Sequence, residues 1–356
     1  MAELAPSSFA IEATEAVARL EKTEAVHFSV ARRPSRGLVA FWLATLLLGG
    51  AAIPAAAQNS ELPNDEAQHG DAERVSAAVV DASCGALESV EQALDRGWSH
   101  FADRAVGARG TRAAPEPIGS AVECFERALA LAPDRDDVVA ALLRALFFQG
   151  EYATPSDDER KRIFLEATEL FELQIEQVAE QFEIDFRDAD PHRAAERVGA
   201  RRADLGATFF YGALHWGLWA QSYGKMAALR AGVAKRIRDY GELSLAMAPQ
   251  IADAGPHRLV GQLHAEAPRV VFLTMWIDRK RALQELERAV ELSPDDPLNL
   301  TYLAEALVEF RRDRNRAAEL LQRAVSTPPR EHHLVEDRSA IELARSAQRA
   351  LGLSGG

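Results

Sequence analysis

The sequence lacks the motifs that mark most classes of enzyme. It contains no H-E-x-x-H pair of histidines, no G-x-S-x-G nucleophile turn, no Gly-rich phosphate loop and no zinc-finger spacing. Acidic residues are abundant, but they alternate with arginine on predicted helix faces, as at Glu285, Glu287 and Arg288. We therefore expect no catalytic residues, no metal site and no cofactor, and we interpret the chain as non-enzymatic.

Cysteine is scarce as well. The 356 residues include only Cys84 and Cys124, which both fall on predicted helices. They either form a disulfide or remain two buried thiols, and the sequence leaves both possibilities open. An excess of positive charge is also missing, since 54 acidic residues against 41 basic ones give a net charge of −13. This balance argues against nucleic-acid binding, because contacts to phosphates need clusters of basic side chains.

Strand signals are rare, whereas Ala, Leu, Arg and Glu dominate, and this composition favours an all-α fold. A repeated pattern is more specific. The segment 282–294 reads A-L-Q-E-L-E-R-A-V-E-L-S-P, and the segment 121–133 reads A-V-E-C-F-E-R-A-L-A-L-A-P. In both, Ala is followed by Leu or Phe after four residues, by Ala after three more and by Pro after a further five. This spacing is typical of the second helix of a tetratricopeptide (TPR) unit.

Two further copies extend the pattern. A third copy starts at Ala317, which is 35 residues after Ala282 and close to the TPR period of about 34 residues. A degenerate fourth copy starts at Ala167 and lacks the proline. A single helical hairpin of this kind cannot bury its apolar face alone, so the hairpins must stack. We therefore predict a TPR-like helical-hairpin solenoid over residues 77–352.

An export signal is predicted near the N-terminus. Residues 31–57 begin with arginines, continue as an apolar run over 38–48 and end in small residues at 55–57. This order is typical of a secretory signal peptide. The apolar segment is also about long enough to remain as a membrane anchor, so both interpretations stay open. We predict an exported, periplasmic protein.

The segments on either side of this signal differ in character. Residues 1–30 precede it, and they are either a genuine extension or the result of a true start at Val30 through an alternative initiation codon. Residues 58–76, which follow the signal, are polar and are expected to form a flexible linker. The predicted TPR-like domain then occupies 77–352.

The most aromatic stretch of the chain is 205–224. Its aromatic side chains spread around most of the helical wheel, which is typical of a helix buried on nearly all sides. A helix that lines a cavity for an apolar ligand is the alternative, because such cavities are walled by aromatic side chains with a few polar groups. The candidate cavity residues are Phe209, Phe210, Tyr211, His215, Trp216, Trp219 and Tyr223.

A second candidate region follows at 255–264, which reads G-P-H-R-L-V-G-Q-L-H. The proline is expected to start a helix, and the second glycine is expected to permit close helix packing. The candidate residues for helix packing or partner contact are Gly255, Pro256, His257, Arg258 and Gly261.

Four segments occur in a recognisable order. They are the aromatic helix F-F-Y-G-A-L-H-W-G-L-W-A at 209–220, the segment 255–264, the repeat at 282–294, and V-E-D-R-S-A-I-E-L-A-R-S-A-Q-R-A-L at 335–351. In this order, the region 87–351 resembles the T-component family of TRAP transporters, which are TatT-like periplasmic proteins. The resemblance implies a helical TPR-like protomer that assembles as a homotrimer. It also implies docking to a periplasmic solute-binding protein, and a hydrophobic cavity for an organic or lipid-like ligand.

Two functions therefore compete at this point. The first is a TRAP-type substrate-uptake component with an apolar cavity. The second is a general periplasmic TPR scaffold for protein–protein interaction. An apolar cavity lined by the helix 205–224 would favour the first, whereas a scaffold needs only a polar groove.

Overall fold

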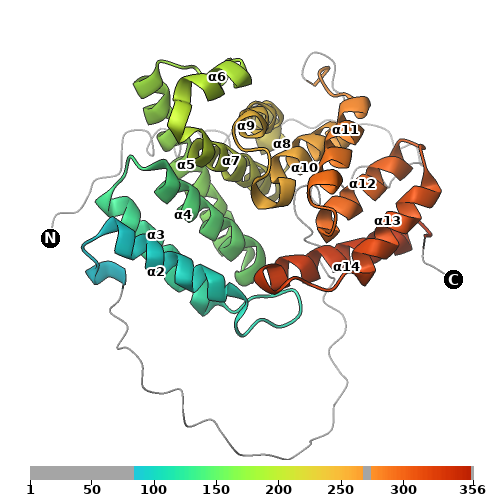
Figure 1. Ribbon diagram of the computed structural model, residues 1–356, viewed down its shortest axis with the longest axis horizontal. Coiled ribbons are helices and arrows are strands. Elements are labelled where there is room, and N and C mark those ends of the chain that lie inside the picture. Colours follow the sequence, from blue (N-terminus) through green and yellow to red (C-terminus); the bar gives the residue numbers. More distant parts are fainter. Residues whose placement is uncertain (1–83, 268–273, 354–356) are drawn as a thin grey trace, which may run out of the picture. The chain divides into compact units, whose positions relative to one another are not determined.

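The computed structural model describes residues 84–267 and 274–353 (Figure 1). Within these ranges every regular element is helical, apart from an isolated bridge between Arg109 and Arg112. The predicted all-α fold is confirmed. None of the helices in the described part of the chain has the length and apolar character needed to cross a membrane. The extension 1–30, the signal-like segment 31–57 and the linker 58–76 lie outside the described residues.

The helices pack as neighbours along the chain. They are α2 (Val90–Ala102), α3 (Pro115–Leu131), α4 (Asp136–Phe148), α5 (Asp157–Phe182), α6 (Pro191–Val198), α7 (Arg202–Tyr223), α8 (Lys225–Arg230), α9 (Val233–Met247), α10 (Ile251–Glu266), α11 (Arg279–Leu292), α12 (Pro297–Glu309), α13 (Arg314–Ser326) and α14 (Leu334–Ala350). Each helix from α2 to α5 packs on the next, α7 packs on α4, α5 and α9, and each helix from α9 to α14 again packs on the next. This nearest-neighbour packing is that of a helical solenoid.

The repeat positions found in the sequence lie at the centres of these helix contacts. Their exposed fractions are 0–3%, and they are Ala121, Phe125, Ala128, Ala167, Phe171, Gln174, Ala282, Leu286, Ala289, Ala317, Leu321 and Ala324. Small alanines at these positions let neighbouring helices approach closely, as the TPR pattern predicts. In the degenerate copy, Gln174 takes the place of the second alanine, and its Nε2 donates to Oδ1 of Asp136 at 2.9 Å. The buried amide is therefore satisfied.

Several helices begin at the residues that cap them. The Ser156 hydroxyl accepts a hydrogen bond from the Glu159 amide at the start of α5. The Asp296 carboxylate accepts one from the Asn299 amide at the start of α12. Because such side chains satisfy amides that have no partner within the helix, they fix where a helix begins.

Three local features interrupt or extend the helices. Residues 225–247 form two helices, α8 and α9, because Gly232 adopts a left-handed φ of 63° between them. After α4, the chain continues as a π-helical turn over Gln149–Ala153. The polar stretch between α5 and α7 contains the short helix α6, which starts with Asp190 as its cap.

Cys84 and Cys124 are joined by a disulfide. It connects a 3-10 turn at Cys84–Ala86 to the middle of α3. Of the two possibilities that the sequence left open, the structure has the disulfide. The two cysteines are 40 residues apart in sequence, so the bond closes a loop that contains all of α2.

Candidate ligand-binding site

A cavity lies between the first and last helices of the described stack. Its volume is about 110 Å³. One water molecule needs about 10–15 Å³ by the same measure, so the cavity has room for several waters or for part of a small organic ligand. Its wall is formed by side chains from α2, α4, α7, α10, α12 and α14 and from three connecting segments. Helices far apart in the sequence therefore meet around it.

One part of the wall is aromatic. Phe147 of α4 and both Phe210 and Tyr211 of α7 belong to it. The ring centroid of Tyr211 lies 6.2 Å from that of Phe147 and 5.0 Å from that of Phe210, which are favourable distances for aromatic pairs. Gly255 of α10 makes room for these rings, because a Cβ at that position would lie 2.5 Å from Cζ of Phe210.

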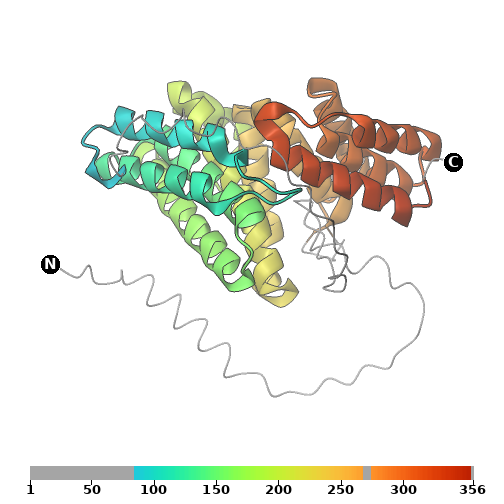
Figure 2. The ribbon, with the colours of Figure 1, turned by 90° about the horizontal axis from the view of Figure 1, so that it is seen from below.

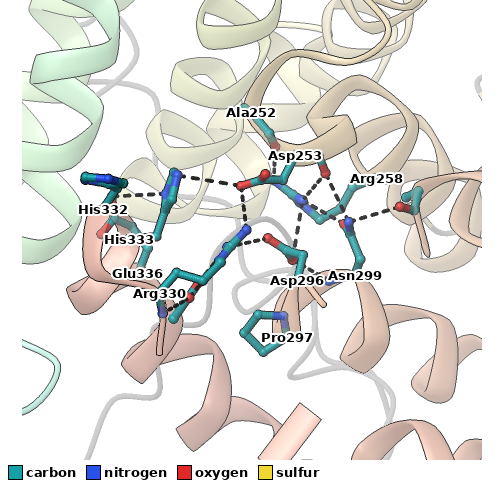
Figure 3. A network of polar contacts seen from close by, with 12 residues as sticks. Ala252, Asp253, Arg258, Asp296, Pro297, Asn299, Arg330, His332, His333 and Glu336 are labelled. Atoms are coloured by element: carbon teal, nitrogen blue, oxygen red, sulfur yellow. Dashed lines mark hydrogen bonds and ion pairs between the residues drawn. The ribbon is translucent and has the colours of Figure 1, made fainter. Parts of the chain in front are cut away.

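Another part of the wall is built on a left-handed turn (Figure 3). Ala252, Asp253 and Ala254 have φ values of 49°, 55° and 61°, which cost non-glycine residues free energy unless their surroundings hold them. Arg258 holds this turn, since its guanidinium donates to the carbonyl oxygens of Ala252 at 3.2 Å and Asp253 at 3.3 Å. The side-chain amide of Asn299 makes two further contacts. Its Nδ2 donates to the Asp253 carbonyl oxygen at 3.0 Å, and its Oδ1 accepts from the Arg258 guanidinium at 2.7 Å.

Arg330 is the centre of the polar network beside this turn (Figure 3). Its guanidinium lies 2.7 Å from a carboxylate oxygen of Asp337, 2.9 Å from one of Asp296 and 3.1 Å from one of Asp253. Burial opposes the charge of Arg330, but the hydrogen bond to Asp337 and the charges of Asp296 and Asp253 raise its pKa above the usual range. Arg330 therefore stays charged, and its donors are already taken up by carboxylates.

The chain after α2 lies beside α14 (Figures 1 and 2), and Arg104 joins these two ends of the described stack. It follows α2, and its guanidinium donates to Oε1 of Glu336 in α14 at 2.8 and 3.0 Å. It also donates to the carbonyl oxygens of Phe101 and His332. The Arg104 side chain is 6% exposed and that of Glu336 is 22% exposed. Because Glu336 is part of the cavity wall, this ion pair holds a wall residue in place.

A few polar groups of the wall have unused hydrogen-bonding capacity. Arg144 of α4 lies 5.6 Å from the ring centroid of Trp98 and 4.8 Å from that of Phe101, and among the described residues it has no hydrogen bond or ion pair. Within the same part of the chain, the Tyr302 hydroxyl and Oε2 of Glu336 are buried without a hydrogen-bond partner. Buried polar atoms without partners are rare in folded proteins, and a ligand or water would satisfy them.

The structure places only part of the predicted cavity set at this cavity. Phe210 and Tyr211 line it. Phe209 is fully buried in the core, where its ring stacks on Tyr240 at 5.9 Å. His215 is also fully buried, with its Nε2 2.9 Å from the Leu143 carbonyl oxygen. Burial lowers the pKa of His215 to about 4, although the hydrogen bond with the Leu143 backbone acts in the opposite direction.

Three predicted cavity residues lie on a different side of α7. The Trp216 indole donates to Glu172 at 2.8 Å and packs under the Arg236 guanidinium, which is 4.4 Å from the ring centroid. Trp219 stacks on Tyr223 with centroids 4.8 Å apart. At about 100° per residue, positions 216, 219 and 223 form a stripe opposite the one formed by 210 and 214. They therefore cannot share the cavity with Phe210.

The second predicted set is divided in a similar way. Gly255 and Arg258 line the cavity. Pro256 stands at the point where regular helical conformation begins, directly after the left-handed turn. His257 lies away from the cavity wall, with Nδ1 2.7 Å from Oε2 of Glu285. Gly261 faces α11, because a Cβ there would lie 2.7 Å from Cγ of Leu286.

Sequence reasoning missed most of the wall, including the polar residues Arg144, Tyr302, Arg330 and Glu336. For Arg144 a signal was present, since it is the one charged residue within the apolar run V-V-A-A-L-L-R-A-L-F-F at 138–148. The other three lie in segments that are ordinary for solvated helices and loops. Only the tertiary contacts between α12, α14 and the rest of the stack bring them to the cavity.

Among the comparisons with known proteins, only the comparison with solved structures finds a similarity. No family model matches the chain, and no curated protein matches it. Among solved structures, a thermophilic TPR protein of Thermus thermophilus is similar, with 15% sequence identity and a TM-score of 0.44. The match covers 74% of this chain and 99% of that chain. The assignment of a helical solenoid rests on the helix packing described above.

Proposed function

We propose that this chain is an exported, non-enzymatic helical scaffold that binds an amphipathic organic ligand between its first and last helices and recruits a protein partner. The observation that carries the proposal is the composition of the cavity wall. An aromatic part that includes Phe210 and Tyr211 lies in the same cavity as Arg144, a cation without a polar partner among the described residues. An apolar pocket with a few polar groups is the usual form of a small-molecule site.

The two parts of the wall would have different roles. Burial of apolar ligand surface against the rings contributes roughly 25 cal/mol per Å², before the cost of ordering the ligand. Arg144 would then bind an acceptor-bearing head group, because its donors are free of carboxylates and its cation rests on Trp98 and Phe101. Arg258 and Arg330 are poorer anchors, since their donors are taken up by Asn299, by backbone carbonyls and by carboxylates.

A non-enzymatic role fits the same wall. The acidic side chains Asp296 and Asp337 are held by Arg330, and Oε1 of Glu336 is held by Arg104. A general acid or base must be within hydrogen-bond reach of the substrate proton that it moves, whereas these carboxylate oxygens are already paired with arginines. The proposal is therefore one of binding without chemistry.

The finer form of the proposal is a component of a TRAP-type substrate-uptake system. In this form the chain docks a periplasmic solute-binding protein and assembles as a homotrimer. The support is the resemblance to the T-component family, together with the fact that two of the resembling segments meet at the cavity. Segment 209–220 contributes Phe210 and Tyr211, and segment 255–264 contributes Gly255 and Arg258. A general scaffold without a ligand is the alternative, because a stack of helical hairpins is itself a surface for protein partners.

Export is supported by two independent features. The signal-like segment 31–57 is one of them. The disulfide between Cys84 and Cys124 is the other, because disulfides persist mainly in oxidising compartments such as the periplasm.

Native mass spectrometry of the chain isolated from its native host tests the proposal. We expect wild-type protein to retain an organic ligand, and we expect Leu214→Trp to lose it, because Leu214 lines the cavity and a larger side chain would fill the space. Trp216→Ala is the matched control, since Trp216 packs on Glu172 and Arg236 outside the cavity. Retention of the ligand by Leu214→Trp would refute the cavity site. A ligand-free wild type that co-purifies with protein partners would support the general scaffold instead.

A further inference from the structure

Cys84, His100 and Cys124 form a cluster that is separate from the cavity. The two sulfur atoms and one imidazole nitrogen all lie within 4.8 Å of one another. The three residues come from the 3-10 turn at Cys84–Ala86, the last turn of α2 and the middle of α3. Cys84 is 5% exposed, Cys124 is fully buried, and His100 is half-buried. None of the three belongs to the cavity wall.

Two cysteines and a histidine are the ligand types that zinc prefers. Zinc–sulfur bonds of about 2.3 Å and zinc–nitrogen bonds of about 2.0 Å place ligand atoms roughly 3.5–3.8 Å apart in a tetrahedral site. The observed separations of up to 4.8 Å therefore require small side-chain rotations rather than a rearrangement of the helices. Three protein ligands leave the fourth position to water, as in zinc sites with an open coordination position.

We propose that Cys84, His100 and Cys124 form a redox-controlled zinc site, which the disulfide closes and reduction opens. A dithiol reductant breaks the sulfur–sulfur bond by transferring two electrons and two protons to the two sulfurs, and the dithiol itself becomes a disulfide. Zn²⁺ then displaces the two thiol protons, so that two thiolates and the neutral imidazole bind the ion. Oxidation reverses the sequence, because a disulfide offers zinc no thiolate.

A purely structural role accounts for less of the arrangement. A disulfide alone would explain the proximity of Cys84 and Cys124, and a helix C-terminus alone would explain a histidine at position 100. Neither requires a third zinc-type ligand atom, the imidazole nitrogen of His100, to lie within 4.8 Å of the two sulfurs. A zinc site requires all three features together.

Zinc titration of the full chain tests the site. The protein is reduced with a dithiol, separated from it under inert atmosphere and titrated with Zn²⁺ against a chromophoric chelator, with helicity followed by circular dichroism. We expect one zinc ion for each reduced chain and none for the oxidised chain. His100→Gln should weaken zinc binding at least about tenfold, since loss of an outer-shell partner alone costs 10–100-fold. His192→Gln, at an exposed position of α6, is the matched control and should bind zinc as the wild type does.

Each alternative outcome has a clear meaning. A reduced wild type that keeps its helicity and binds no zinc overturns the proposal, as does a His100→Gln variant with unchanged affinity. If reduction lowers the helicity, recovery on addition of zinc supports the proposal, and failure to recover overturns it. Cobalt substitution gives a second readout. Thiolate-to-cobalt charge-transfer absorption should appear with the reduced wild type and should weaken in Cys84→Ser.

Discussion

Gly212 lies where α7 packs on α5, and replacing it with alanine tests this contact directly. A Cβ at Gly212 would lie 2.2 Å, 2.4 Å and 2.5 Å from three carbons of the Phe171 ring, whereas non-bonded carbons normally approach to about 3.5–4.0 Å. The ring cannot move away freely, because Phe171 is fully buried and its centroid lies 4.8 Å from that of Tyr240. We therefore expect overpacking to cost about 1–3 kcal/mol of unfolding free energy.

Gly119 in α3 is the matched control. It also lies inside a helix, but a Cβ there would have no atom within 4 Å. Alanine is favoured over glycine in a helix by about 0.8–1.0 kcal/mol, and this gain applies to both positions. Gly119→Ala should therefore be more stable than the wild type by up to about 1 kcal/mol. The difference between the two variants isolates the overpacking of Phe171, at about 1–3 kcal/mol.

Urea unfolding followed by circular dichroism measures both variants. The expected order of unfolding midpoints is Gly119→Ala highest, wild type next and Gly212→Ala lowest, with similar slopes against urea concentration. If Gly212→Ala rises as much as Gly119→Ala, the ring of Phe171 does not lie against α7. The packing of α5 on α7 described here would then be wrong.

Three buried groups give further predictions. Arg104→Leu removes the arginine that is paired with the Glu336 carboxylate. We expect urea unfolding to show a loss of about 2–4 kcal/mol, less than for a fully buried pair because Glu336 is 22% exposed. Burial lowers the pKa of His215 to about 4 in the folded protein, below its unfolded value of 6.5. The folded state therefore favours the neutral imidazole, and the stability that this group contributes is present above pH 6.5 and is lost as the pH falls toward 4. His215→Gln should therefore lose less stability than the wild type between those pH values in thermal unfolding. Cys84→Ser opens a loop of 40 residues and should lower the unfolding free energy by up to about 4 kcal/mol, whereas unchanged urea midpoints would contradict the disulfide with Cys124.

The helical fold could be predicted from the sequence because its signals are local. The alanine repeat marks buried positions on helices, and these positions are buried in the structure at all four copies, including Ala167 and Ala317. Boundaries that depend on a single backbone conformation were harder to predict. Gly232 could have continued the helix, and its left-handed φ of 63° divides α8 from α9 instead.

The cavity could be predicted only in part, because its wall comes from helices far apart in the sequence. Aromatic density identified α7, but it did not reveal which stripe faces inward, since both stripes carry large rings. Phe210 and Tyr211 face the cavity, while Trp216 and Trp219 face Glu172 and Tyr223. A lone arginine in an apolar helix is a signal that sequence analysis can use, and Arg144 is such a case.

A crystal structure of the chain purified from its native host would show what occupies the cavity between α4, α7 and α14. We expect density for an organic ligand whose apolar part lies against Phe210 and Tyr211 and whose acceptor group lies within hydrogen-bond distance of Arg144. A cavity that holds only ordered water, in protein that carries a ligand bound elsewhere on its surface, would contradict this expectation.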